Sequence, residues 1–119
     1  MFKATLEKIV EEVPDSVGAV LMGYDGIAID QHFIDSGDMD IQLIALEYSN
    51  IVKEIRHTAD VLGTGALQEV TITTGRYYVI IHALTDEYFV ALTLLRDGNL
   101  GKGRYLILRE ATALRQALV

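Results

Sequence analysis

Apolar residues recur with helical spacing at the start of the chain, and Pro14 follows the last of them. One helix face would carry Phe2, Leu6, Ile9, Val10 and Val13. The helix should end before Pro14, because proline disfavours helical geometry in the residue that precedes it. The continuous apolar segment VGAVLMG (17–23) then predicts a buried strand. Its Asp25-Gly26 turn favours a hairpin with the segment that follows.

The second strand of that hairpin, IAIDQHF (27–33), alternates between two faces. We expect Ile27, Ile29, Gln31 and Phe33 on one face, and Ala28, Asp30 and His32 on the other. The polar segment DSGDMD (35–40) then offers Asp38 or Asp40 as the N-cap of a long helix. This helix should run to about Leu62, because Gly63 and Gly65 are typical of a helix end.

Three further strands and a last helix complete the pattern. The strands are LQEVTITT (67–74), YYVIIHAL (77–84) and YFVALTLL (88–95), joined by short turns, and the final helix follows residue 99. The order α-β-β-α-β-β-β-α predicts an α+β fold: one five-stranded antiparallel sheet with helices on both faces. No linker or repeat interrupts it, so residues 1–119 are expected to form a single domain.

Composition narrows the functional classes. The chain has 119 residues, with ten basic against seventeen acidic side chains and a net charge of -7. This charge argues against a nucleic-acid partner, which requires clustered lysine and arginine. No apolar run reaches the ~18 residues of a membrane span, so membrane insertion is not expected. The first residues do not have the pattern of a signal peptide, and a cytoplasmic location is expected.

The stretch DGNLGKGRYLILRE (97–110) contains the glycines and lysine of a phosphate-binding loop but not their required spacing. Gly98 and Gly101 are too close together, and Lys102 is followed by Gly103 where a serine or threonine would bind magnesium. We expect Asn99 to cap the last helix. Gly101 and Gly103 would then let that helix approach the sheet closely. No cofactor is expected.

Three histidines each have a carboxylate nearby in sequence. Asp30 precedes His32, Glu54 and Asp60 flank His57, and Asp86 follows His82. No second histidine joins any of these groups, so we expect solvated or core-edge histidines without a metal site. No serine has the glycine-flanked turn of a nucleophile. The sequence therefore offers no set of catalytic residues, and an enzyme is not expected.

The long helix carries more apolar surface than one sheet requires. One stripe should cover the sheet: Ile41, Ile44, Ala45, Tyr48, Val52, Ile55, Ala59 and Leu62. Leu43 and Leu46 point away from it, on the side of Asn50, His57 and Val61. The polar strand 67–74 has the composition of a sheet edge, which a second copy can extend. The candidate dimer residues are Ile51, Val61, Leu67, Glu69, Val70, Thr71 and Thr73. The alternative is a monomer with a blunted edge.

Three segments resemble the Roadblock family of small dimeric domains related to dynein light chains, and within it the bacterial MglB-like members. They are VGAVLMGYDGIAID (17–30), LGTGALQEVTITT (62–74) and DGNLGKGRYLILREA (97–111). The resemblance implies a profilin-like sheet with two helices on one side and the long helix on the other. It also implies a homodimer formed through the long helix and the third strand.

The resemblance further implies a function. MglB-like proteins act on a small Ras-like GTPase and accelerate its GTP hydrolysis without donating an arginine finger. The paired long helices would form the docking surface, for which the candidates here are Leu43, Leu46, Glu47, Asn50 and Glu54. Two alternatives stay open: a non-catalytic dimeric scaffold or adaptor, and a small-molecule sensor with a cavity between the sheet and a helix.

Overall fold

The computed structural model describes residues 2–34 and 40–119, and its elements follow the predicted order. They are α1 (Phe2–Glu12), β1 (Ser16–Gly23), β2 (Ala28–Phe33), α2 (Ile41–Leu62), β3 (Glu69–Thr73), β4 (Tyr77–Ala83), β5 (Tyr88–Leu95) and α3 (Leu100–Ala117). The Asp40 carboxylate accepts a hydrogen bond from the Leu43 N–H and caps α2, as predicted. Gly63 ends α2 in the left-handed conformation. The alternative cap, Asp38, lies outside the described residues.

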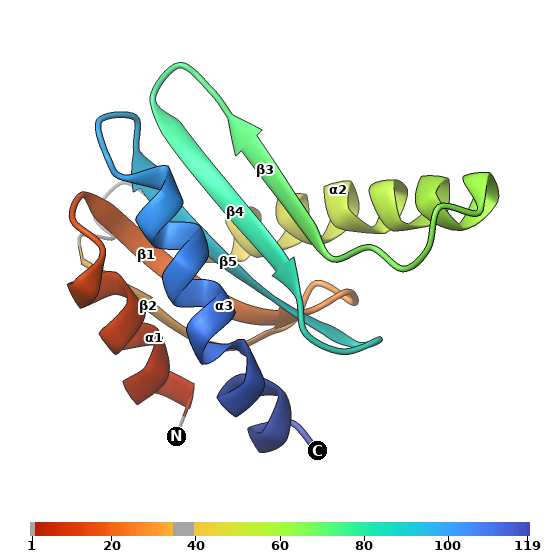
Figure 1. The fold of residues 1–119 in the computed structure, drawn as a ribbon, viewed down its shortest axis with the longest axis horizontal. Coiled ribbons are helices and arrows are strands. Elements are labelled where there is room, and N and C mark those ends of the chain that lie inside the picture. The colour runs from red at the N-terminus through yellow and green to blue at the C-terminus, as the bar shows by residue number, and fades with distance from the viewer. Residues whose placement is uncertain (1, 35–39) are drawn as a thin grey trace.

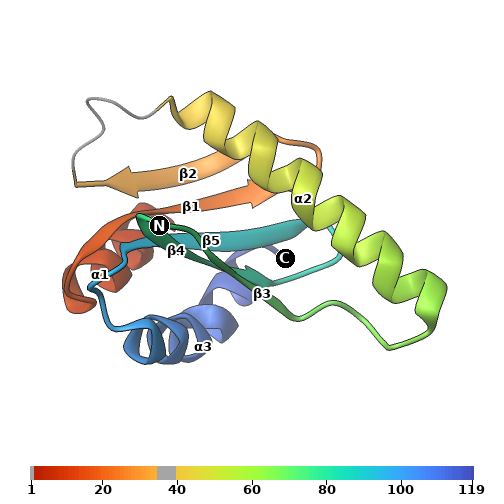
Figure 2. The same ribbon diagram turned by 90° about the horizontal axis from the view of Figure 1, so that it is seen from above.

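The strands form one sheet in the order β2-β1-β5-β4-β3, and every neighbouring pair is antiparallel. The fold class is therefore confirmed, and β2 and β3 are the two sheet edges. Helices α1 and α3 cover one face, and α2 crosses the other (Figures 1 and 2). Within the described part of the chain, no helix combines the length and apolarity needed to span a membrane.

Each face of the sheet has its own apolar core. The α1/α3 side buries Leu6, Ile9, Leu21, Ile80, Leu92 and Ile107, among others. The α2 side is smaller and includes Val20, Met22, Val52, Ile81 and Phe89. Alternate residues of the central strands therefore serve opposite cores, which explains the nearly continuous apolar sequence of β1, β4 and β5.

The predicted alternation of β2 is wrong at one point. Leu21 pairs with Asp30, but Met22 pairs with Ala28, so Ile29 is an extra residue in the ladder. Ala28 consequently packs against the α2-side core. The sequence pattern predicts Ala28 on the same face as Asp30, but Asp30 pairs with Leu21, which belongs to the other core. A bulge of one residue shifts every side chain beyond it to the other face.

The cap of α3 confirms the structural interpretation of the glycine loop. The Asn99 side chain accepts a hydrogen bond from the Lys102 N–H at 3.0 Å. Gly103 is buried against the sheet, as predicted. The expectation for Gly101 is wrong, because this residue is exposed and does not face the sheet.

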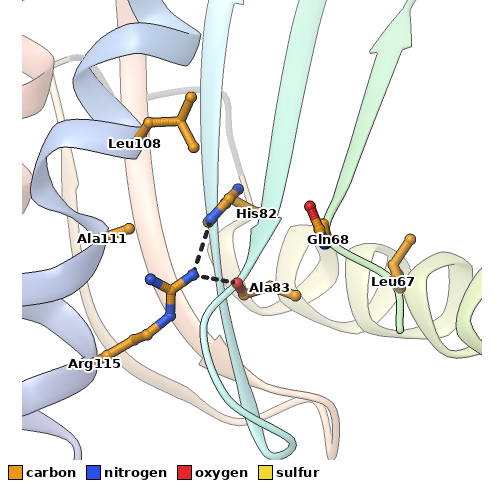
Figure 3. A pocket seen from close by; sticks show the side chains of 7 residues that line it. All are labelled: Leu67, Gln68, His82, Ala83, Leu108, Ala111 and Arg115. Atoms are coloured by element: carbon orange, nitrogen blue, oxygen red, sulfur yellow. Dashed lines mark hydrogen bonds between the residues drawn. The ribbon is translucent and has the colours of Figure 1, made fainter. Parts of the chain in front are cut away.

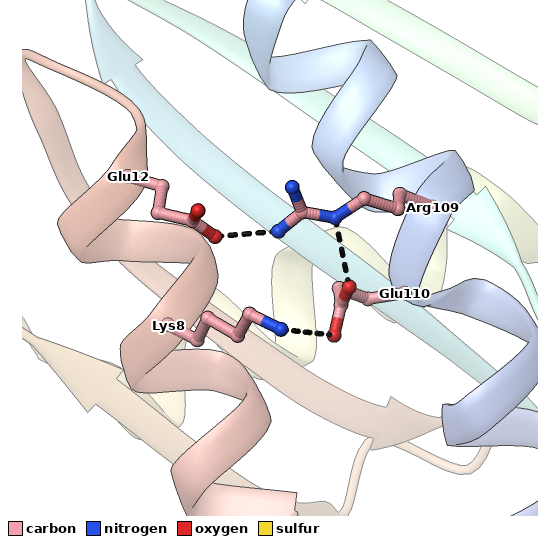
Figure 4. A network of polar contacts seen from close by, with 4 residues as sticks. All are labelled: Lys8, Glu12, Arg109 and Glu110. Carbon is pink, nitrogen blue, oxygen red and sulfur yellow. Dashed lines mark hydrogen bonds and ion pairs between the residues drawn. The ribbon is translucent and has the colours of Figure 1, made fainter.

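Polar side chains bridge α1 and α3 on their solvent side (Figure 4). Arg109 lies 2.5 Å from Glu12 and 3.0 Å from Glu110, and Lys8 lies 3.5 Å from Glu110. Exposed ion pairs contribute little stability, so the apolar contact beneath them holds the two helices on the sheet.

The long helix covers the sheet with only part of its length. Its 22 residues span about 33 Å, and Figure 2 shows its last turns extending past the strands. Ala45 and Val52 are buried as predicted, but Leu62, assigned to the same stripe, is 68% exposed. The last turns of α2 keep the predicted helical phase but extend past the strands, so the sheet does not bury their apolar side chains.

Candidate protein-interaction surface

The outer edge of β3 presents unpaired backbone groups. The Ala83 N–H donates to the Gln68 carbonyl, and the Thr74 N–H donates to the Tyr77 carbonyl, each at 2.9 Å. In an antiparallel ladder, bonded and non-bonded pairs alternate, so the even-numbered residues of this strand bond to β4. The three intervening residues direct their N–H and C=O groups away from the sheet: Glu69, Thr71 and Thr73. No hydrogen bond from another described residue meets them.

The outer edge of β2 is occupied by side chains at Gln31. The Ile34 N–H bonds to the Val17 carbonyl, which places Gln31 among the residues whose backbone points outward. The Gln31 N–H donates to Asp30 Oδ1 at 2.8 Å, and its carbonyl accepts from Lys3 Nζ at 3.0 Å. The two sheet edges therefore differ in their capacity to add another strand.

The side chain of Glu69 is held clear of the open edge. Arg104 of α3 binds its carboxylate with two groups, Nε at 3.1 Å and Nη2 at 2.7 Å from Oε2. On the other face of β3, Val70 and Ile72 pack against the α2-side core. Side chains thus support β3 on both faces while its outward backbone groups stay accessible.

The predicted docking residues of α2 lie on its exposed side. Leu43 and Leu46 are 53% and 50% exposed, and Glu47, Asn50 and Glu54 are also exposed. Of the predicted dimer residues, Ile51, Val61, Thr71 and Thr73 are exposed, whereas Leu67, Glu69 and Val70 are half-buried. The docking candidates and four of the seven dimer candidates are therefore exposed, whereas the other three are partly covered within the chain.

The one arginine of α2 is engaged within the chain. The Arg56 guanidinium lies 4.4 Å from the centre of the Tyr24 ring and donates to the Asp86 carbonyl at 2.8 Å. Burial raises the pKa of the Tyr24 hydroxyl, so this ring is neutral beneath the cation. Arg56 therefore fastens α2 to the β4–β5 turn and is not available at its outer face.

The histidines lie apart from one another. His32 Nδ1 is 3.9 Å from Glu7 of α1, and His57 is exposed on α2. His82 is buried beside Arg115 of α3, a partner that sequence proximity to Asp86 did not indicate. Among the described residues, no group of three or more histidine, cysteine, aspartate or glutamate side chains could hold a metal ion.

A five-stranded antiparallel sheet with two terminal helices on one face and a long helix on the other is the architecture of profilin-like domains. The chain is 31% identical to MglC from Myxococcus xanthus over 96% of both chains, with a TM-score of 0.70. It belongs to the Roadblock/LC7 family.

Two more distant structures share the fold. M. xanthus MglB is 12% identical with a TM-score of 0.89, over 98% of this chain and 93% of that chain. A Roadblock/LC7 domain from Streptomyces avermitilis is 18% identical with a TM-score of 0.87, over 98% and 96%. No family model and no curated protein sequence matches the chain.

Proposed function

We propose that this Roadblock-fold regulatory module is a homodimer that binds a small Ras-like GTPase and stimulates its GTP hydrolysis. The observation that carries the proposal is the open edge of β3 beside an exposed α2, in a sheet whose other edge is occupied at Gln31 by Lys3 and Asp30. Membership of the Roadblock/LC7 family and similarity to MglB and MglC support it.

Pairing of two copies would follow from the backbone of β3. A two-fold axis through Thr71 would place Glu69 of one copy opposite Thr73 of the other, with Thr71 opposite itself. All the outward N–H and C=O groups of the strand would then be hydrogen-bonded. The same axis would bring the two α2 helices together on one face of a continuous sheet. Ile51 and Val61 would lose their exposure to water in this contact.

The GTPase would dock on the outer side of the paired α2 helices. Leu43 and Leu46 supply apolar contact area, and Glu47 and Glu54 supply negative charge around it. A net charge of -7 favours a partner with basic residues near its nucleotide pocket and raises the association rate. Because Arg56 is engaged with Tyr24 and Asp86, stimulation would act by repositioning the partner's own residues.

Two measurements, made one after the other, test the proposal. Sedimentation should give twice the 13.2 kDa chain mass. A Ras-like GTPase from the same genome should then bind more tightly in its GTP form, and single-turnover assays should show faster hydrolysis. A monomer at high concentration would contradict the dimer. Equal binding of both nucleotide forms without acceleration would contradict the regulatory role.

A non-catalytic dimeric adaptor is the second candidate. It is favoured by the engagement of Arg56 and by the apolar and acidic character of the remaining candidate docking residues. This role requires a surface for binding but no group that assists chemistry. An adaptor would bind its partner independently of nucleotide, and substitutions on α2 would abolish binding without altering any hydrolysis rate.

A further inference from the structure

An open pocket lies on the sheet face opposite α2, between α3, β4 and the start of β3 (Figure 3). Its volume is about 350 Å³. The lining residues are Leu67, Gln68, His82, Ala83, Leu108, Ala111 and Arg115. Four of these are leucine or alanine and three are polar, so the walls combine apolar and polar surface in similar amounts. Leu67 is also a candidate dimer residue, but the other lining residues belong to neither predicted interaction surface.

One charge dominates the lining. The Arg115 guanidinium donates from Nε to the Leu84 carbonyl at 2.8 Å, and from Nη2 to the Ala83 carbonyl and to His82 Nε2 at 3.4 and 3.3 Å. All three partners are neutral. Two are backbone carbonyls, and the third is His82, whose pKa is lowered by burial and by the adjacent Arg115. Within the described residues Nη1 has no partner, and the lining contains no carboxylate.

The other arginines of α3 differ from Arg115. Arg104 is paired with Glu69, and Arg109 with Glu12 and Glu110. Their charges are therefore balanced within the chain. Arg115 is the arginine of α3 that keeps an uncompensated positive charge, and it lies half-buried in the pocket wall.

The apolar surface continues out of the pocket along α3. Leu108 borders the pocket and is 56% exposed, and Tyr105, three residues earlier on the same helix face, is 62% exposed. A small molecule would use only the pocket, whereas an extended apolar face beside it suits a longer ligand. Helix α2 lies on the other face of the sheet, so a partner docked on α2 leaves this surface accessible (Figure 2).

We propose that this surface binds a short acidic segment of another protein. The segment places an aliphatic side chain in the pocket against Leu108 and Ala111, and a neighbouring glutamate or aspartate on Nη1 of Arg115. Tyr105 packs on the part of the segment that leaves the pocket. A carboxylate bound to a guanidinium forms charge-assisted hydrogen bonds, and the partial burial of Arg115 reduces their competition with water. The inference does not require the GTPase, and its pocket shares only Leu67 with the candidate dimer residues.

Nuclear magnetic resonance of the ¹⁵N-labelled full chain tests the inference with a defined probe. The probe is a blocked tetrapeptide of two leucines and two glutamates. We expect saturable shifts of the backbone amides of His82, Ala83, Leu108 and Ala111, with an affinity in the millimolar range. Replacing the glutamates by glutamines, or the leucines by serines, should each weaken binding about tenfold.

Two protein variants localise the effect. Leu108→Glu removes apolar area and repels the carboxylate, so binding of the leucine–glutamate probe should fall about tenfold. Ala113→Glu adds the same charge at an exposed position of α3 outside the pocket and should leave binding unchanged. Both positions are exposed, so the fold is retained in either variant.

Three results would overturn the inference. The first is the absence of localised shifts with the leucine–glutamate peptide. The second is equal binding of the three peptides or equal effects of the two variants. The third concerns hexanoate, a small carboxylate with an apolar tail. If hexanoate binds as tightly as the peptide, the pocket takes a small molecule and the protein segment is the wrong occupant.

Discussion

Gly103 of α3 lies against Ile80 of β4 so closely that a Cβ on residue 103 would come within 3.0 Å of Ile80 Cδ1. Leu94 and Leu92 would be 3.2 and 3.3 Å away. The Cβ of an alanine at Gly101 would meet only Asn99 Oδ1, at 3.6 Å. Two glycines that look equivalent in sequence therefore have different roles, and only Gly103 sets the distance between helix and sheet.

Substitutions at these two glycines should have opposite effects on stability. Gly101→Ala should raise the free energy of unfolding by up to about 1 kcal/mol, because alanine is the better helix former and fits the open space. Gly103→Val should lower it by about 1–3 kcal/mol, because its methyl groups must displace the buried side chains of β4 and β5. Urea denaturation of both variants measures the effects. Similar effects at the two positions would contradict the close packing of residue 103.

The difference between the two sheet edges predicts the response to proline. Thr71→Pro removes an outward N–H from the open edge and should shift the protein from twice the chain mass to 13.2 kDa. Gln31→Pro removes an outward N–H that already bonds to Asp30, so the dimer should persist. Light scattering of both variants distinguishes the edges. A dimeric Thr71→Pro variant would show that the copies meet elsewhere.

The exposed leucines of α2 separate partner docking from dimer formation. Leu43 and Leu46 lie on the side of α2 that faces away from the sheet, whereas Ile51 lies nearer to its flank. Leu43→Asp with Leu46→Asp should abolish GTPase binding while the dimer mass is unchanged. Ile51→Asp should instead weaken the dimer, because it buries a charge in the contact. Parallel pull-downs and light scattering test the assignment, which fails if the leucine variant becomes monomeric.

Local signals in the sequence predicted the elements and their caps. Asp40, Gly63 and Asn99 act within one helical turn of their own position, so contiguous residues contain the information. The open strand was also predictable, because threonines and a glutamate interrupt its apolar residues. Leu43 and Leu46 were identified as exposed from helical phase alone.

The features that the sequence did not predict depend on contacts between distant segments. Lys3 blocks the β2 edge at Gln31, and Arg104 holds Glu69, across separations of 28 and 35 residues. Likewise, helical phase assigned Leu62 to the buried stripe, but this residue is exposed because α2 extends past the strands. The pocket beside Arg115 joins residues of β4, α3 and the segment before β3, and has no contiguous motif.

The contact of Arg56 with Tyr24 predicts how firmly α2 is attached. Arg56→Met keeps the aliphatic packing but removes the cation over the ring and the hydrogen bond to Asp86. The free energy of unfolding should fall by about 1 kcal/mol. Hydrogen exchange should increase in the second half of α2, where few other contacts reach the sheet. Arg76→Met should have a smaller effect, because the Arg76 guanidinium lies farther from its aromatic partner, 5.5 Å from the centre of the Tyr77 ring.

The buried His82 predicts the response to pH. Arg115 can only donate to Nε2, so the neutral ring carries its proton on Nδ1, which is buried without a hydrogen-bond partner in the described residues. Burial and then Arg115 lower the pKa of His82 below 6.5 in the folded chain, although Glu69 opposes this shift. Between the two pKa values the unfolded chain binds more protons, so the free energy of unfolding should rise with pH and level off above about 6.5.

Urea denaturation between about pH 5.5 and 8 measures the slope. His82→Gln should reduce it, whereas His57→Gln, at an exposed position of α2, should leave it unchanged. An unaltered slope in the His82 variant would show that other groups cause the pH dependence.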